Sequence, residues 1–100
     1  MTIRHVVMWK LASEGGQERA AQAAEVARRL NALEGVVPQL RAISAGANSL
    51  YVGENWDVVL VADVDTPEDL EAYQVHPAHQ EAAAYIRSVV ESRVAVDFEV

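Results

Sequence analysis

Three histidines and a tyrosine are the side chains of this sequence best suited to proton transfer. Two of the histidines, His76 and His79, stand with Tyr73 in the stretch YQVHPAHQE, and the third, His5, lies near the start of the chain. A histidine with the ordinary pKa of about 6.5 can accept a proton at neutral pH from a carbon flanked by carbonyl groups. A phenol can donate a hydrogen bond to the enolate that forms. Both roles need a dry, shaped pocket, so the elements that carry these residues must converge on one.

Each of these residues also has a purely structural interpretation. His5 alternates with aliphatic residues, as a hydrogen-bonded core histidine would. His79 is placed where it could cap a helix or lie on the surface, and Tyr73 fits an apolar stripe as a core aromatic with a solvated hydroxyl. His76 precedes Pro77, and residues before proline are pushed out of the helical region, which favours a role in shaping a joint. For His5, Tyr73 and His79 the sequence leaves both interpretations open.

The spacing of His76 and His79 raises the question of a metal site. Two histidines three residues apart can bind one metal ion from a continuous helix, but Pro77 interrupts the helix between them. No further acidic residue stands at a spacing from His76 and His79 that would complete a metal site, so we expect no metal. The sequence has no cysteine, which excludes disulfides, a thiolate nucleophile and cysteine-ligated zinc or iron–sulfur centres.

Length and composition indicate one globular domain over residues 1–100. Of the 100 residues 51% are hydrophobic, too many for a disordered chain, and 23% are charged and spread so that no run could span a bilayer. The first residues lack the pattern of a secretory signal, so we expect a cytoplasmic protein without a membrane partner. The net charge of −7 and the lack of a basic cluster make nucleic acid a poor candidate partner.

Hydrophobic periodicity predicts four strands and two helices, the second of them broken at Pro77. The expected ranges, in chain order, are a strand over 3–11, a helix over 17–33, strands over 40–46 and 56–64, a helix that opens at Thr66-Pro67, its second piece over 78–90, and a strand over 92–100. Gly35 fits a left-handed cap after the first helix. The order strand, helix, strand, strand, helix, strand is that of the ferredoxin-like α+β fold, β-α-β-β-α-β, with a four-stranded antiparallel sheet and the helices on one face.

The face of the sheet without helices is predicted to be partly apolar. It would carry Val59 and Val61, together with either Val6 and Met8 or the alternate residues of the first strand. Such a patch usually marks an interaction surface. Pairing two sheets face to face would bury it with a gain of roughly 25 cal/mol per Å² of apolar area, so we expect a homodimer. Trp9 and Trp56 are expected to face the core.

Five short segments together resemble one protein family, over nearly the whole chain. They are Ile3-Arg4-His5-Val6-Val7, Val37-Pro38, Trp56-Asp57-Val58-Val59-Leu60, Tyr73-Gln74-Val75-His76-Pro77-Ala78-His79 and Val96-Asp97-Phe98. These landmarks resemble the stress-responsive dimeric α/β-barrel proteins, often called Dabb. The resemblance implies a ferredoxin-like protomer that dimerises through its sheet into a dimeric α/β barrel.

The resemblance also implies a function, since some members of this family look like polyketide cyclases that act without a cofactor. By this resemblance His79 is the general base and Tyr73 holds or polarises a carbonyl oxygen, which makes these two the catalytic candidates. His5, His76 and Asp97 are the substrate-binding candidates, with Asp97 orienting a histidine. The ligand would be a small hydrophobic molecule with a carbonyl group, and no cofactor would be needed. The alternative is a non-catalytic stress-response protein that acts through its oligomeric assembly.

The first helix leaves the size of such a pocket open. It offers Ala20, Ala23, Ala27 and Leu30 to the core, where a ligand-binding relative would often have bulkier or aromatic walls. Small side chains either widen a pocket or let it collapse. The sequence does not decide between an enclosed space and a packed core.

Overall fold

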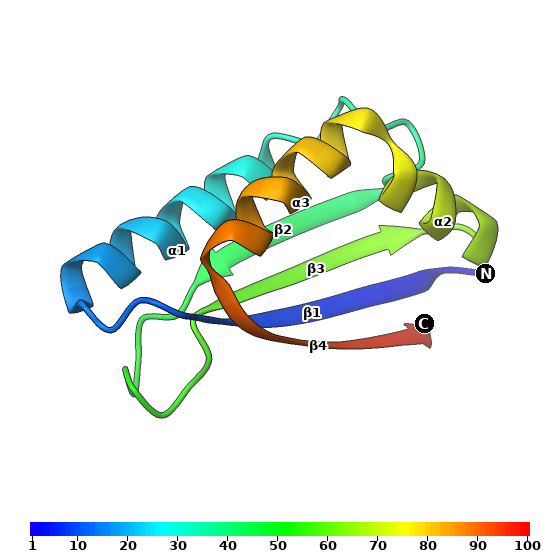
Figure 1. Ribbon diagram of the computed structural model, residues 1–100. Helices are drawn as coiled ribbons and strands as arrows, with labels where there is room; N and C mark the ends of the chain where they lie inside the picture. The colour runs from blue at the N-terminus through cyan, green and yellow to red at the C-terminus, as the bar shows by residue number, and fades with distance from the viewer.

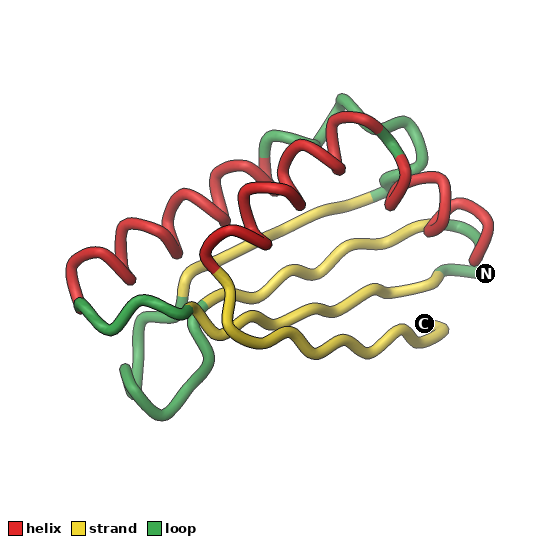
Figure 2. The backbone as a smooth tube through the Cα atoms, viewed as in Figure 1, coloured by secondary structure: helices red, strands yellow, loops and turns green.

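The computed structural model describes all 100 residues, and it shows one antiparallel sheet with three helices packed on one of its faces (Figure 1). The elements are β1 (Ile3–Leu11), α1 (Gly16–Asn31), β2 (Ala42–Ala47), β3 (Val58–Val64), α2 (Pro67–Val75), α3 (Pro77–Val89) and β4 (Val90–Glu99). The four strands lie in the order β2-β3-β1-β4. Figure 2 shows the helical layer above the strands, with the loops at the two ends of the sheet. The predicted ferredoxin-like fold is confirmed.

β1 is a central strand whose two faces differ, as its alternating sequence predicts. His5, Val7, Trp9 and Leu11 are buried, and they face the helices. In the antiparallel pairing with β4, His5 lies opposite Asp97 and Trp9 lies opposite Arg93. This register brings polar residues of the last strand beside the buried face of the first.

α1 packs through a face that largely matches the predicted one, with Val26 added and Ala20 left out. Its buried residues are Ala23, Val26 and Leu30, whereas Ala20 is exposed. The helix ends at Asn31 rather than Leu33, because the backbone tightens there: Leu33 N donates to Leu30 O at 3.1 Å. Gly35 adopts a left-handed φ of 78° in the turn that follows, as only glycine does without strain.

The start of β3 is a second departure from prediction. The strand begins at Val58, so Trp56 lies outside it and is only partly buried. The reason is Asp57, whose carboxylate accepts a hydrogen bond from Leu11 N at 2.7 Å, while Asp57 N donates to Trp9 O at 2.9 Å. These bonds to the end of β1 take the chain out of the strand alternation before Val58.

The helix break at Pro77 is confirmed, and its geometry follows from the residues around it. α2 begins after Thr66, whose Oγ1 accepts a hydrogen bond from Asp69 N at 3.1 Å, as N-cap threonines do. α2 ends at Val75, and His76 is extended with φ −61° and ψ 135°, the conformation favoured before proline. The His76 ring then caps α3, because its Nδ1 accepts from Ala78 N at 3.1 Å.

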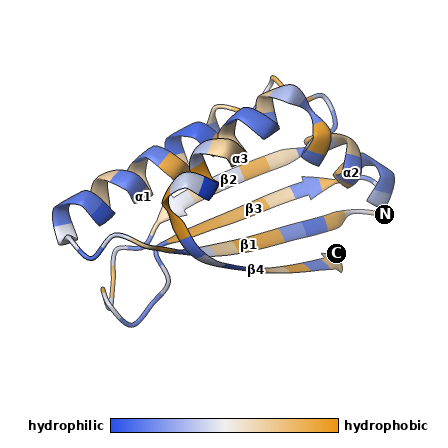
Figure 3. Cartoon of the chain, viewed as in Figure 1, coloured by the Kyte–Doolittle hydropathy of each residue, from blue (hydrophilic) through white to orange (hydrophobic).

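The opposite face of the sheet is uncovered in the protomer and is rich in apolar side chains. β3 is apolar along most of its length, and β1 and β4 mix hydrophobic with hydrophilic residues (Figure 3). The apolar residues exposed on the uncovered face are Met8, Val59, Val94, Val96 and Phe98. We call this surface the open face.

None of the three helices combines the length and apolar character that a membrane span needs.

Candidate functional site

A cavity of about 280 Å³ lies between the sheet and the helices, close to the lower limit of about 300 Å³ for small-molecule sites. Its lining comprises His5, Val7, Trp9, Leu30, Leu60, Gln74, His79, Ala83, Ile86, Arg87 and Arg93. We call it the histidine cavity. Space therefore remains between the helices and the sheet, and the layer has not collapsed.

His79 stands in the first turn of α3 with one ring nitrogen already committed. Its Nδ1 lies 3.0 Å from the carbonyl oxygen of Gln74, and a carbonyl can only accept, so Nδ1 carries the proton. Nε2 is then the unprotonated nitrogen. Burial lowers the pKa of His79, and electrostatic repulsion from His5, Arg93 and Arg87 lowers it further, against the opposing effect of the hydrogen bond to the Gln74 carbonyl. The ring is therefore neutral at pH 7 and can act as a base.

His5 is held by Asp97 across the β1–β4 pairing. The His5 side chain is 3% exposed, and its Nδ1 is hydrogen-bonded to Asp97 Oδ1, whose side chain is 44% exposed. The Asp97 carboxylate accepts the proton on His5 Nδ1 and fixes the orientation of the ring. The other ring nitrogen, Nε2, is not part of this hydrogen bond. The resemblance assigned Asp97 to orient a histidine, and the structure places it against His5.

Tyr73 is packed against both histidines from α2. Its ring meets the His5 ring edge-on, with centroids 6.4 Å apart, and lies 4.4 Å from the His79 ring. The residue is fully buried and does not line the cavity, yet its hydroxyl has no hydrogen-bond partner within the chain. Burial raises the pKa of Tyr73 to about 12, so the phenol keeps its proton and can only donate or accept as a neutral group.

His76 lies apart from this group. Its ring caps α3 at the joint, and it is not among the residues that line the cavity. The structure thus brings together His5, Tyr73, His79 and Asp97, and leaves His76 in the structural role that its position before proline suggests. No three side chains of the metal-binding types form a cluster that could hold a metal ion.

Three polar lining residues were missed by sequence reasoning: Gln74, Arg87 and Arg93. The sequence did contain a pattern that could have pointed to Arg87 on its helix and to Arg93 on its strand. His79, Ala83 and Arg87 recur at intervals of four and therefore share one face of a helix. Arg93 and Asp97 likewise share one face of a strand, but only the register with β1 shows that this face borders the cavity.

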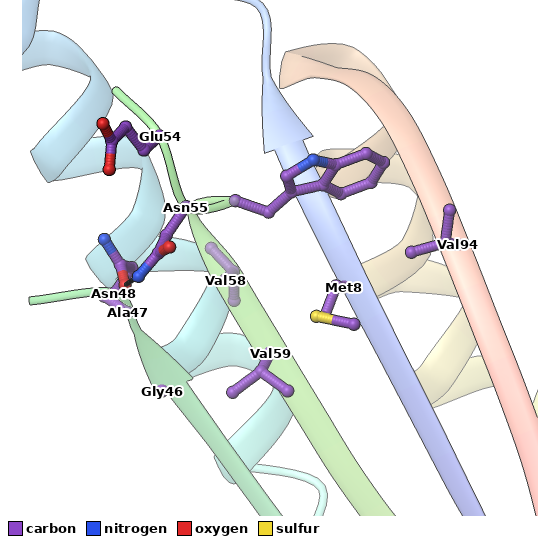
Figure 4. Close-up of a pocket in the computed structure, with 10 residues that line it drawn as sticks. Met8, Gly46, Ala47, Asn48, Glu54, Asn55, Val58, Val59 and Val94 are labelled. Atoms are coloured by element: carbon purple, nitrogen blue, oxygen red, sulfur yellow. Dashed lines mark hydrogen bonds between the residues drawn. The ribbon is translucent and has the colours of Figure 1, made fainter. Parts of the chain in front are cut away.

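A larger hollow of about 560 Å³ lies on the open face. Figure 4 shows Met8, Val59 and Val94 projecting from three neighbouring strands on the side away from the helices. The only titratable residue that lines this hollow is Glu54. It is a place for apolar contact, whereas the groups able to transfer protons lie in the histidine cavity.

The sequence pattern of the family described as Stress responsive A/B Barrel Domain, or Dabb, matches residues 3–100. The chain belongs to the Dabb family. This confirms the resemblance carried by the five segments and agrees with the ferredoxin-like topology. No curated protein sequence matches the chain.

Solved structures similar to this Dabb chain include two bacterial proteins of unknown function described as dimeric and ferredoxin-like. The one from Bacteroides fragilis is 28% identical with a TM-score of 0.90, over 99% of this chain and 96% of that one. The one from Thermobifida fusca is 32% identical with a TM-score of 0.84, over 100% and 92%. SnoaB, a cofactor-independent oxygenase from Streptomyces nogalater, shares the fold at 13% identity and a TM-score of 0.73, over 99% and 92%.

Proposed function

We propose that this Dabb protein is a homodimer whose histidine cavity binds a small hydrophobic molecule with a carbonyl group and transfers a proton from the carbon beside that carbonyl without a cofactor. Such a transfer is the first step of a cyclisation of the polyketide-cyclase kind. The observation that carries the proposal is the hydrogen bond from His79 Nδ1 to the Gln74 carbonyl, because it leaves Nε2 as an unprotonated base in a cavity between the sheet and the helices.

The chemistry needs a base, a donor for the developing oxyanion and a low-dielectric surrounding. His79 Nε2 takes the proton as the carbon–hydrogen bond breaks, and the electron pair moves to the carbonyl oxygen to give an enolate. Tyr73 keeps its proton because burial raises its pKa to about 12, and its hydroxyl lacks a partner in the chain. Because Tyr73 is fully buried and does not line the cavity, we assign it to hold the two histidine rings in place. His5, which is oriented by Asp97 and does line the cavity, is assigned to hold the substrate.

The proposed dimer forms through the open face. Met8, Val59, Val94 and their neighbours leave a contiguous apolar surface exposed in the protomer, larger than single scattered residues would make. The similar structures from Bacteroides fragilis and Thermobifida fusca are both described as dimeric. These observations support a two-fold pairing of sheets.

Exchange of a carbon-bound proton tests the catalytic proposal. The probe is 1-phenylbutane-1,3-dione, in which one carbon stands between two carbonyls, and deuterium uptake at that carbon in D₂O is followed by NMR. We expect exchange above the buffer rate and a loss of about 100-fold or more in His79→Gln, the usual range for removal of a general base.

His76→Asn is the matched control, because asparagine can still cap α3 and the residue does not line the cavity. We expect its exchange rate to stay near that of the parent. An unchanged rate in His79→Gln, with both variants folded, would refute the catalytic proposal. It would favour the second candidate, a non-catalytic stress-response protein that acts through the assembly formed by its open face.

A further inference from the structure

Two of the arginines differ from every other basic side chain of the protein. The chain has eight lysines and arginines, and six of them form ion pairs with carboxylates: Arg4, Lys10, Arg19, Arg28, Arg29 and Arg41. The two that do not are Arg87 and Arg93, and both line the histidine cavity. One comes from α3 and the other from β4.

Carboxylates are abundant in this protein, so the lack of a carboxylate partner for Arg87 and Arg93 needs an explanation. Fifteen acids stand against eight basic residues, but no carboxylate lines the histidine cavity. Two carboxylates of β4, the strand that carries Arg93, are engaged elsewhere, Asp97 with His5 and Glu91 with Lys10. The cavity therefore presents positive charge in a protein whose net charge of −7 would otherwise repel an anion.

The arginines are separated from the proton-transfer groups along both elements that carry them. On α3, Arg87 follows His79 by eight residues, about 12 Å of helix rise. On β4, Arg93 precedes Asp97 by four residues, about 13 Å of strand. The two spacings agree, so the cavity has a histidine end and an arginine end.

We propose that the ligand of the histidine cavity is a keto acid with an apolar body, whose carboxylate is bound by Arg87 and Arg93 at the end remote from the reacting carbonyl. The assignment of the reacting end rests on the proposed function. A guanidinium presents paired donors that match a carboxylate, and two guanidiniums converging from a helix and a strand fix both its charge and its position. The apolar body would lie against Val7, Leu60 and Ile86.

A pair of matched probes tests this inference. The acid is 4-(3-oxobutanoyl)benzoate and the neutral compound is 4-(3-oxobutanoyl)benzamide, which share the diketone and the ring and differ in charge at the remote end. Dissociation constants are measured by isothermal titration calorimetry. We expect the parent protein to bind the acid about ten-fold or more tightly than the amide, given the strength of charge-assisted hydrogen bonds.

The double variant Arg87→Gln/Arg93→Gln should bind the two probes equally. Arg28→Gln/Arg41→Gln is the matched control, since it removes the same charge from two arginines paired with other carboxylates, and it should keep the preference for the acid. Equal binding of acid and amide by the parent would overturn the inference, and so would a preference that survives in the Arg87→Gln/Arg93→Gln variant.

The same probes separate this inference from the proposed function. If the amide undergoes His79-dependent deuterium exchange while the acid has no advantage, the keto-acid assignment is wrong and the catalytic proposal stands. If neither probe binds or exchanges, both are wrong.

Discussion

The two faces of the sheet are built from the same strands but differ in where they place polar and apolar side chains. On β1 the buried face carries His5, Val7 and Trp9, as expected under a layer of helices. β4 inverts the usual arrangement: Arg93 and Asp97 point to the helix side, and Val94, Val96 and Phe98 lie on the open face. An antiparallel sheet with one solvated face normally shows polar residues there. The inversion is what the proposed sheet-to-sheet dimer would require of the open face, while the covered face holds polar groups beside its core.

The hollows on these two faces also differ, and size is a poor guide to their roles. The one on the open face has about 560 Å³ and a single titratable lining residue. The histidine cavity has about 280 Å³ but is lined by two histidines and two arginines. Chemistry follows the positions of ionisable groups, so the smaller hollow is the candidate active site.

The largest expected effect comes from a charge placed on the open face. Val59→Asp would bury an unpaired carboxylate in the apolar contact between two sheets, which costs several kcal/mol. We expect the dimer to dissociate at micromolar concentration, as measured by analytical ultracentrifugation. Val36→Asp is the control, because this exposed valine follows α1 on the helical side and the dimer should persist. A dimer that survives Val59→Asp would show that the open face is not the interface.

A smaller loss of stability is expected from a leucine of the covered face. Leu30 is fully buried, and Leu30→Ala should lower the free energy of unfolding by about 2–5 kcal/mol, the range for removing a buried leucine side chain. Leu50→Ala, at an exposed loop position, should change it by less than about 0.5 kcal/mol. Urea unfolding followed by circular dichroism measures both. Equal effects would mean that the covered face does not contain the core.

The smallest effect concerns the charge state of His79. Its pKa is lowered chiefly by burial, and further by His5, Arg93 and Arg87, which line the same cavity, with the hydrogen bond to the Gln74 carbonyl opposing. Neutral Tyr73 packs on the same ring. An NMR titration should therefore place its midpoint below the ordinary value of about 6.5.

The sign of the linked stability change follows from this direction. The unfolded chain takes up a proton near pH 6.5 while the folded ring still resists it, so stability falls as the pH drops from about 6.5 through the folded pKa. This acid-side loss should be smaller in His79→Gln. A midpoint above 6.5 would mean that the ring is exposed or paired with an acid.

Local patterns predicted most of the fold because they report local physics. Alternation identified β1 and β4, and Thr66 with Pro67 marked the start of α2 correctly. Trp56 was wrongly predicted to lie in β3. The strand starts later because of a tertiary hydrogen bond from Leu11 N to the Asp57 carboxylate, and an alternating sequence pattern gives no sign of such a bond. The early end of α1 at Asn31 has a local origin instead, the tightened turn in which Leu33 N donates to Leu30 O.

The candidate site was predictable only where sequence neighbours meet in space. Tyr73 and His79 share a short stretch, and the resemblance to the Dabb family pointed to both. Arg87 and Arg93 were missed because their significance depends on which basic residues lack a carboxylate partner. That depends on every ion pair of the folded chain, and so it becomes visible only in the structure.

The most direct test of the contrast between the two faces is a map of where a ligand binds. Addition of 4-(3-oxobutanoyl)benzoate to isotopically labelled protein, followed by methyl and amide NMR shifts, compares both hollows in one experiment. We predict shifts for Val7, Ala83 and Ile86 in the histidine cavity, with the signals of Met8 and Val59 unchanged. Shifts confined to Met8, Val59 and Val94 would contradict this prediction and place ligand binding on the open face.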